Sequence, residues 1–204
     1  MKSLLEIVTR SIDDFSEKEG IVRFGAIIGG EAVILHGVPR TTLDLDILFF
    51  AEDQRSRDDS LVKRLAAFLG QAMGEGFEVE EFEASRDPFD PLRHDLIIIT
   101  DSENRFKKLD ILIANYEWEL EGLREMDSPS EGPLQVFPIP YLVAMKLMAG
   151  GAQDEEDIRN LFLVMTGPEK EKSLELARLI KRDKNLSRVL ASGRHGRRTR
   201  EDGN

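Results

Sequence analysis

The sequence predicts an α+β fold, in which a mixed β-sheet core flanked by helices is followed by a helical C-terminal subdomain. Strand and helix patterns alternate through the first 126 residues, whereas only helical patterns follow residue 139. Between them, DSPSEGP at 127–133 is rich in Pro, Ser and Gly, as linkers are. We therefore expect a core over 1–126, a helical subdomain over 134–191 and a basic, disordered tail over 192–204.

The first half of the core begins with an amphipathic helix predicted over about residues 2–15, which Gly20 ends. The strand pattern VRFGAII follows at 22–28, and Gly29 and Gly30 then open a short helix that stops before Pro39. The run LDLDILFF at 43–50 has strand length, with alternating and then continuous apolar residues.

The second half of the core continues with a helix within residues 58–76 and three strand patterns, FEVEEFEA, HDLIIIT and KKLDILIAN. The last two are expected to form a hairpin or to lie near each other in one sheet. A further helix is predicted over 116–126. The helical subdomain is expected to contain helices over 140–149, 153–165, 169–182 and 185–191.

The composition of the 204 residues limits the kind of protein and the kind of metal site. Forty-one per cent of the residues are hydrophobic and 33% are charged, which is typical of a soluble globular protein. The absence of cysteine excludes disulfides, thiolate metal ligands and cysteine nucleophiles. The sequence has no apolar run of membrane-spanning length and no signal-like N-terminus, so we expect a cytoplasmic protein without membrane contact.

The formal charge of −11 opposes non-specific phosphate binding over the whole surface. The charge is uneven, since nine Lys or Arg and only three Asp or Glu follow from Arg178 onward. The basic tail could recruit an RNA or DNA acceptor, or it could only raise solubility.

Two aspartates interrupt the apolar strand at 43–50. Residues two apart on a strand share a face, so Asp44 and Asp46 project together while Leu43, Leu45 and Ile47 are expected on the opposite, buried face. Two adjacent carboxylates repel each other unless a positive charge lies between them. With oxygen ligands alone, Mg²⁺ or Mn²⁺ is the expected ion, and Mg²⁺ commonly binds together with substrate phosphates.

A third aspartate and a glycine pair complete this pattern. Asp110 interrupts a second apolar strand, as the further carboxylate of a two-metal phosphoryl-transfer site would. Gly29 and Gly30, between a strand and a helix, would let the backbone approach a phosphate closely.

These residues, from Gly29-Gly30 through Arg40, Thr42, Asp44 and Asp46 to Asp110, resemble the nucleotidyltransferase superfamily with the DNA polymerase β-like fold. The resemblance covers roughly residues 20–115 and is greatest to small prokaryotic AbiEii/AbiGii-toxin-like nucleotidyltransferases. It implies a nucleotidyltransferase core that moves a nucleoside monophosphate from an NTP to an acceptor. Gly29 and Gly30 would then seat the triphosphate, Asp44 and Asp46 would bind Mg²⁺, and Asp110 would complete the metal site and take the acceptor's proton.

Other residues have two possible interpretations. Arg40 could contact phosphate or pair with an acidic neighbour, and Lys146 could bind phosphate or lie along the surface of its helix. Thr42 is a weaker candidate for nucleotide binding. Asp154, Asp157 and His36 could contribute to the site, or the aspartates could favour a helix N-terminus and the histidine could be a cap or a buried imidazole.

Three functions remain open from the sequence. The first is an NTP-dependent transferase that modifies tRNA, another nucleic acid or a protein, as the toxin of a toxin–antitoxin or phage-defence pair with a cognate antitoxin protein. The second is a small-molecule transferase of the aminoglycoside-modifying kind, whose cationic acceptor would suit the acidic body. The third is a non-catalytic nucleotide- or protein-binding module on the same fold.

Overall fold

The computed structural model describes residues 3–52, 60–84, 93–126 and 134–192. The predicted linker at 127–133 and the predicted tail from residue 193 onward lie outside them. Within these ranges, no helix is both long enough and apolar enough to cross a membrane. The described residues form two compact units: one runs to Glu31 and from Thr41 to Val136, and the other combines Ala32–Arg40 with the chain from Phe137 onward.

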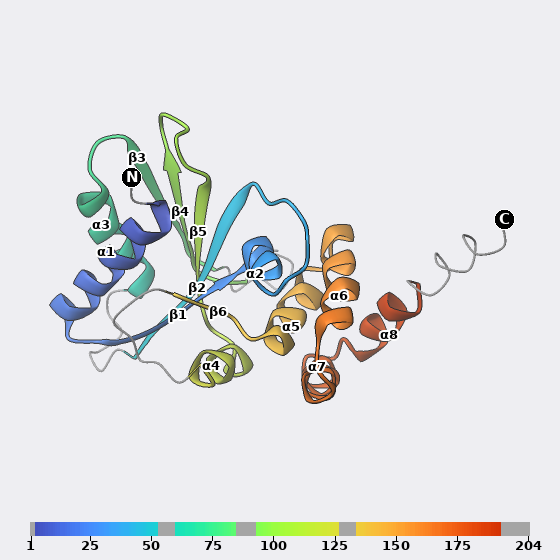
Figure 1. Ribbon diagram of the computed structural model, residues 1–204. Coiled ribbons are helices and arrows are strands. Elements are labelled where there is room, and N and C mark those ends of the chain that lie inside the picture. The colour runs from blue at the N-terminus through green and yellow to red at the C-terminus, as the bar shows by residue number, and fades with distance from the viewer. Residues whose placement is uncertain (1–2, 53–59, 85–92, 127–133, 193–204) are drawn as a thin grey trace. The chain divides into compact units, whose positions relative to one another are not determined.

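The first unit contains a mixed sheet, which is six-stranded over the described residues, in the order β3-β4-β5-β2-β1-β6 (Figure 1). Its strands are β1 (Val22–Ile28), β2 (Asp44–Glu52), β3 (Phe77–Phe82), β4 (Leu96–Asp101), β5 (Lys108–Ile113) and β6 (Gln135–Val136). β2 pairs antiparallel with β1 and parallel with β5, so it is a central strand. β4 and β5 pair antiparallel, which confirms that these segments are neighbours in one sheet.

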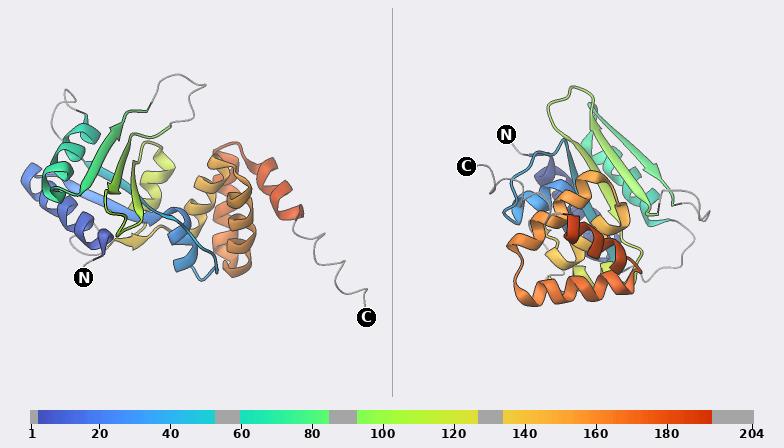
Figure 2. Two further views of the ribbon diagram at one scale, coloured as in Figure 1. Left: turned by 90° about the horizontal axis from the view of Figure 1, so that it is seen from above. Right: turned by 90° about the vertical axis from the view of Figure 1, so that its right-hand side faces the viewer.

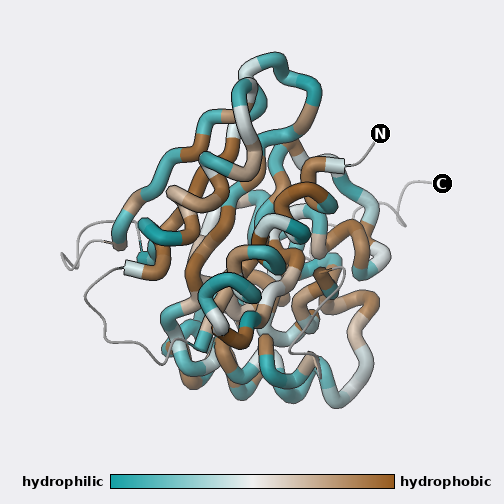
Figure 3. Tube along the Cα trace, turned by 90° about the vertical axis from the view of Figure 1, so that its left-hand side faces the viewer, coloured by the Kyte–Doolittle hydropathy of each residue, from teal (hydrophilic) through white to brown (hydrophobic). Residues whose placement is uncertain are grey.

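Two helices, α1 (Leu4–Glu19) and α3 (Leu61–Met73), cover one face of this sheet (Figure 1). Ser3 and Glu6 form a capping box at the start of α1, and Gly20 ends the helix at φ 64°. Alternate residues of the central strands, such as Ile47, Ile97 and Ile111, pack against the apolar faces of these helices. Figure 3 shows where hydrophobic and hydrophilic residues alternate along the chain.

The alternate strand residues on the other face include the three aspartates. Since residues paired across neighbouring strands share a face, one row runs from Asp46 to Asp110, Ile98 and Glu80. Helix α4 (Glu117–Arg124) contacts β1. The residue before β2 is an exception to the predicted alternation, because Leu43 is 90% exposed rather than buried. The strand begins only at Asp44, so its alternation does not reach Leu43.

The second unit contains helices α5 (Ile139–Ala149), α6 (Ala152–Val164), α7 (Gly167–Leu179) and α8 (Asp183–Ser192), which Figure 2 shows side by side. α5 packs against α6 and α7, and α8 packs against both of them. Tyr141, Leu161, Leu176 and Leu186 are buried in this unit. Helix α2 (Gly29–Leu35) begins at the end of β1, and its residues from Ala32 onward group with the helical unit. The α+β fold class with C-terminal helices is therefore confirmed.

Candidate active site

The parallel pairing of β2 and β5 brings the three aspartates together. Asp46 lies opposite Asp110 in this pairing. Asp44 lies two residues before Asp46 on β2, so its side chain is on the same face. One carboxylate oxygen from each of the three aspartates lies within 4.8 Å of the other two. All three side chains are only partly buried, so the cluster can be reached from solvent.

The side chain of Asp110 is the clearest indication that this cluster fits a cation. Its Oδ2 accepts a hydrogen bond of 2.7 Å from Lys108 Nζ. Its Oδ1 is buried and has no hydrogen-bond partner among the described residues. A buried oxygen without a partner is costly, and a divalent cation would satisfy it. Together with three oxygen donors at short mutual distances, this fits Mg²⁺ or Mn²⁺.

Gly29 makes room for the carboxylate of Asp46. Its φ is 65°, a conformation that glycine adopts without strain. A Cβ atom at this position would lie 1.8 Å from Asp46 Oδ2, so the Asp46 side chain would have to move away. The glycine therefore allows β1 and the start of α2 to lie directly against the aspartate cluster. Gly30 follows it as the second residue of α2.

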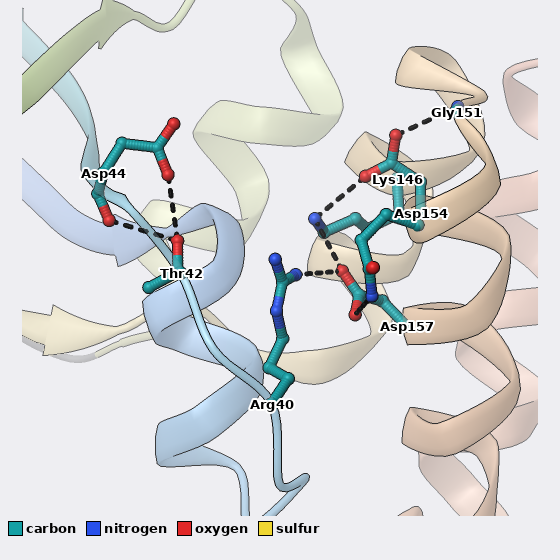
Figure 4. A network of polar contacts seen from close by, with 8 residues as sticks. Arg40, Thr42, Asp44, Lys146, Gly151, Asp154 and Asp157 are labelled. Carbon is teal, nitrogen blue, oxygen red and sulfur yellow. Dashed lines mark hydrogen bonds and ion pairs between the residues drawn. The ribbon is translucent and has the colours of Figure 1, made fainter.

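Thr42 lies beside the first aspartate, at the entrance to β2. Its hydroxyl lies 2.9 Å from Asp44 Oδ1 and 3.2 Å from the Asp44 carbonyl oxygen (Figure 4). A hydroxyl bonded to a carboxylate fixes the rotamer of that carboxylate. The structure thus gives Thr42 a contact with a candidate metal ligand, whereas the sequence predicted a contact with nucleotide.

Lys108 is the site residue that the sequence analysis missed. It begins β5, lies opposite Asp44 in the strand pairing and points its ammonium group to Asp110. The hydrogen bond to Asp110 raises the pKa of Lys108, and the negative charges of Asp110, Asp44 and Asp46 raise it further. Partial burial of the ammonium group opposes this rise. The signal was available, because Lys108 stands two residues before Asp110 and must share its face of the strand.

The helical unit contains a charged cluster of its own, which consists of Arg40, Lys146, Asp154 and Asp157 (Figure 4). Lys146 Nζ lies 2.9 Å from a carboxylate oxygen of each aspartate, and Arg40 Nη1 lies 2.5 Å from Asp157 Oδ2. Asp157 is 1% exposed, and these two cations are its ion-pair partners.

Two opposite pairs of charges balance in this cluster. The two aspartates already balance the charges of Arg40 and Lys146, and the role of these two residues in nucleotide binding stays a prediction. Asp154 also accepts a hydrogen bond from the Gly151 backbone N–H, as the N-terminal interpretation of that residue suggests. His36 Nε2 donates to the Phe137 carbonyl at 2.8 Å, a contact that fixes the end of α2.

Comparisons with known proteins give similar structures but no matching sequence. No family model and no curated protein sequence matches the chain. The structure is similar to terminal uridylyl transferase 4 from Trypanosoma brucei, with 12% identity, a TM-score of 0.40 and coverage of 78% of this chain and 52% of that one. The chain thus spans about half the length of that enzyme.

Two further similar structures match over nearly their whole length. One is an antigenic nucleotidyltransferase-like protein from Paracoccidioides brasiliensis, with 18% identity, a TM-score of 0.43 and coverage of 93% of this chain and 94% of that one. The other is the antibiotic-resistance factor ANT(2'')-Ia, with 15% identity, a TM-score of 0.48 and coverage of 96% and 98%. Identities of this size identify no substrate for the present chain.

Proposed function

We propose that the protein is a dication-dependent nucleotidyltransferase, which transfers a nucleoside monophosphate from an NTP to an acceptor and releases pyrophosphate. The observation that carries the proposal is the convergence of Asp44, Asp46 and Asp110 within 4.8 Å. Two further observations support it. Asp110 Oδ1 is buried without a hydrogen-bond partner among the described residues, and glycine at position 29 leaves room for the Asp46 carboxylate.

The proposed reaction is an in-line displacement at the α-phosphorus. Asp44, Asp46 and Asp110 would hold Mg²⁺ or Mn²⁺, which supplies positive charge for the phosphate oxygens. The acceptor oxygen forms a bond to the α-phosphorus, the bond from that phosphorus to pyrophosphate breaks, and the acceptor proton passes to the Asp110 carboxylate. Gly29 and Gly30 would seat the triphosphate by letting the backbone come close to it.

The acceptor in this proposal is a nucleic acid such as tRNA, or a protein. The resemblance to AbiEii/AbiGii-toxin-like proteins supports a role as the toxin of a toxin–antitoxin or phage-defence pair, with ATP or another NTP as donor and a cognate antitoxin as protein partner. We place this reaction in the cytoplasm.

The test incubates the full chain with each labelled NTP, Mg²⁺ and total cellular RNA or protein, and measures label transfer and pyrophosphate release. Asp44→Asn and Asp110→Asn keep the side-chain size and remove one negative charge each. We expect each variant to lower the rate at least 100-fold, because dication binding and proton transfer depend on these carboxylates. Equal rates in wild type and variants would contradict the proposal, and NTP binding without turnover would support a non-catalytic module.

A second candidate acceptor is a small cationic molecule, such as an aminoglycoside. It is favoured by two exposed glutamates of β3, Glu78 and Glu80, which lie on the same sheet face as the aspartates. Glu80 pairs with Ile98 and Ile98 with Asp110, so about two strand spacings, or ~10 Å, separate the glutamate from the aspartate. An acceptor with a hydroxyl near Asp110 could therefore place an ammonium group near Glu80.

The second candidate is tested with Glu80→Gln, for which Glu81→Gln is a matched control. Both residues are exposed on the same strand, but Glu81 pairs with Ile97 and belongs to the opposite face. With an aminoglycoside panel as acceptor, we expect Glu80→Gln to raise the acceptor KM about fivefold, because the variant loses one solvent-screened ion pair with the acceptor. Glu81→Gln should leave the acceptor KM within about twofold of wild type. Equal KM values in the two variants would contradict this acceptor site.

A further inference from the structure

Lys108 is a basic side chain that the structure places on the aspartate cluster itself. Its Nζ lies 2.7 Å from Asp110 Oδ2, and its backbone pairs with that of Asp44 across the two parallel strands. The lysine side chain is 43% exposed and that of Asp110 is 14% exposed. An ammonium group with this much access to solvent can move without disturbing the core.

Four charged residues thus occupy neighbouring positions on β2 and β5. Asp44 lies opposite Lys108, and Asp46 lies opposite Asp110, so three negative charges and one positive charge share a small area. The net charge of this group is −2. One divalent cation would bring it to zero, whereas the same group without Lys108 would keep one negative charge after binding the cation.

We propose that Lys108 balances the charge of the aspartate site, so that it weakens the binding of a free dication and strengthens the binding of the NTP. The inference rests on the proposed function, since it assumes that the three aspartates bind a dication. A lysine within about 5 Å of a dication repels it and attracts a polyanionic triphosphate. Its two effects therefore have opposite signs.

The two oxygens of Asp110 allow the lysine and the cation to be present together. Lys108 bonds to Oδ2, while Oδ1 is the buried oxygen without a partner in the described part of the chain. A cation bound at Oδ1 need not displace the ammonium group from Oδ2. Lys108 can then remain near the site when the triphosphate arrives, which is the step at which its positive charge is favourable.

An ordinary surface ion pair is the alternative role for this lysine. Exposed pairs contribute little to stability, and their removal changes neither metal nor nucleotide affinity systematically. The two roles are separated by the direction of two binding constants in one variant. Lys108→Met removes the charge and keeps the length of the side chain, whereas Lys108→Arg keeps the charge.

The neighbouring Lys107 offers a matched control. It is 51% exposed at the side chain, and its Nζ lies 3.6 Å from Glu31 rather than at the aspartates. Lys107→Met thus makes the same change in net charge at the adjacent residue, beside the cluster but outside it. Any difference between the two variants reports the position of Lys108 and not the total charge of the protein.

The experiment measures Mn²⁺ binding to the full chain by electron paramagnetic resonance without nucleotide. It then measures binding of the α,β-methylene analogues of the four NTPs at saturating Mg²⁺. By the Coulomb energy of one charge in a solvent-exposed site, we expect Lys108→Met to bind Mn²⁺ about tenfold more tightly and the preferred analogue about tenfold more weakly. Lys108→Arg and Lys107→Met should stay within about threefold of wild type in both measurements.

The outcomes separate the inference from the function on which it rests. If wild type binds no Mn²⁺, or if Asp110→Asn binds it equally well, both the proposed function and the role of Lys108 are overturned. If wild type binds Mn²⁺ through Asp110 but Lys108→Met has unchanged affinities, or shifts both in one direction, only the role of Lys108 is overturned. Circular dichroism of each variant confirms that the fold is kept.

Discussion

Gly29 and Asp46 show how one residue type at one position makes a site possible. The glycine has a positive φ, and the carboxylate of Asp46 occupies the space where any other residue would carry its Cβ. Two separate constraints, backbone conformation and close approach, therefore favour glycine at this position. Neither constraint is needed for a strand-to-helix connection in general, so the glycine serves the aspartate cluster.

Thr42 has a hydroxyl that orients Asp44, and this leads to a residue-scale prediction. Thr42→Val keeps the shape and removes the hydrogen bond to Asp44 Oδ1. We expect about tenfold weaker Mn²⁺ binding, because loss of a partner that orients a ligand has effects of this size. Thr42→Ser retains the hydroxyl and should bind Mn²⁺ within about twofold of wild type.

The measurement is the same Mn²⁺ titration, with nucleotide affinity measured alongside. If Thr42 instead contacts the nucleotide directly, Thr42→Val will weaken NTP-analogue binding at saturating metal while leaving Mn²⁺ affinity unchanged. That result would contradict the orienting role and favour the sequence-based prediction for this residue.

The hairpin between β4 and β5 is fixed by one buried acid, Asp101, at the end of β4. Its carboxylate accepts hydrogen bonds from the backbone N–H groups of Glu103, Arg105 and Phe106 and from the Arg105 guanidinium. The Arg105 hydrogen bond, followed by the backbone N–H groups, lowers the pKa of Asp101 far below its ordinary value despite burial. This turn sets the start of β5, where Lys108 and Asp110 lie.

Asp101→Asn is expected to lower the free energy of unfolding at pH 7. Because the pKa of Asp101 is lower in the folded protein, its stabilising contribution is complete above the unfolded pKa of about 4 and declines as the pH falls below it. The difference between wild type and variant should therefore shrink between about pH 4 and pH 2. Urea unfolding across this range is the measurement, and Glu103→Gln, at a solvent-exposed acid in the same turn, is the control.

The elements themselves were largely predictable, whereas their pairing was not. Alternating apolar residues in LDLDILFF and KKLDILIAN predict two strands with their aspartates on one face. That β2 and β5 are parallel neighbours, with Asp46 opposite Asp110, depends on contacts between distant segments that no local pattern encodes. The expectation that the strands meet comes from the chemistry of a two-metal site, which needs a further carboxylate from a neighbouring strand, and from the resemblance to a family.

Single residues show the same limit of local patterns. The alternation in LDLDILFF predicts Leu43 on the buried face, but the strand begins only at Asp44 and Leu43 is exposed. The pairing of Arg40 with Asp157 joins residues far apart in the sequence, so no spacing could distinguish it from a phosphate contact. Lys108 stands two residues before Asp110 and shares its face of the strand, but a lysine at a strand end is common and by itself indicates no site.

At the scale of the whole molecule, the distribution of charge distinguishes the candidate acceptors. The chain has a net charge of −11, and the glutamates of β3 extend the negative charge along the sheet face of the aspartates. Such a field attracts a cationic acceptor and repels a nucleic acid. Salt screens both effects, with a Debye length of about 10 Å at 0.1 M ionic strength.

The sign of the salt dependence is therefore the last prediction. With NTP and Mg²⁺ saturating, we expect kcat/KM for a cationic aminoglycoside acceptor to fall about tenfold between ~20 and ~200 mM KCl, and the value for RNA to rise over the same range. RNA labelling that instead falls steeply with salt would contradict the second expectation, because it requires that basic residues contact the phosphates. In that case, truncation after Ser192, which removes the basic residues from Arg194 onward, tests which basic residues contact the RNA phosphates. If RNA labelling by the truncated chain no longer falls steeply with salt, the basic tail binds the RNA. If the steep fall persists, the contacts come from the folded units.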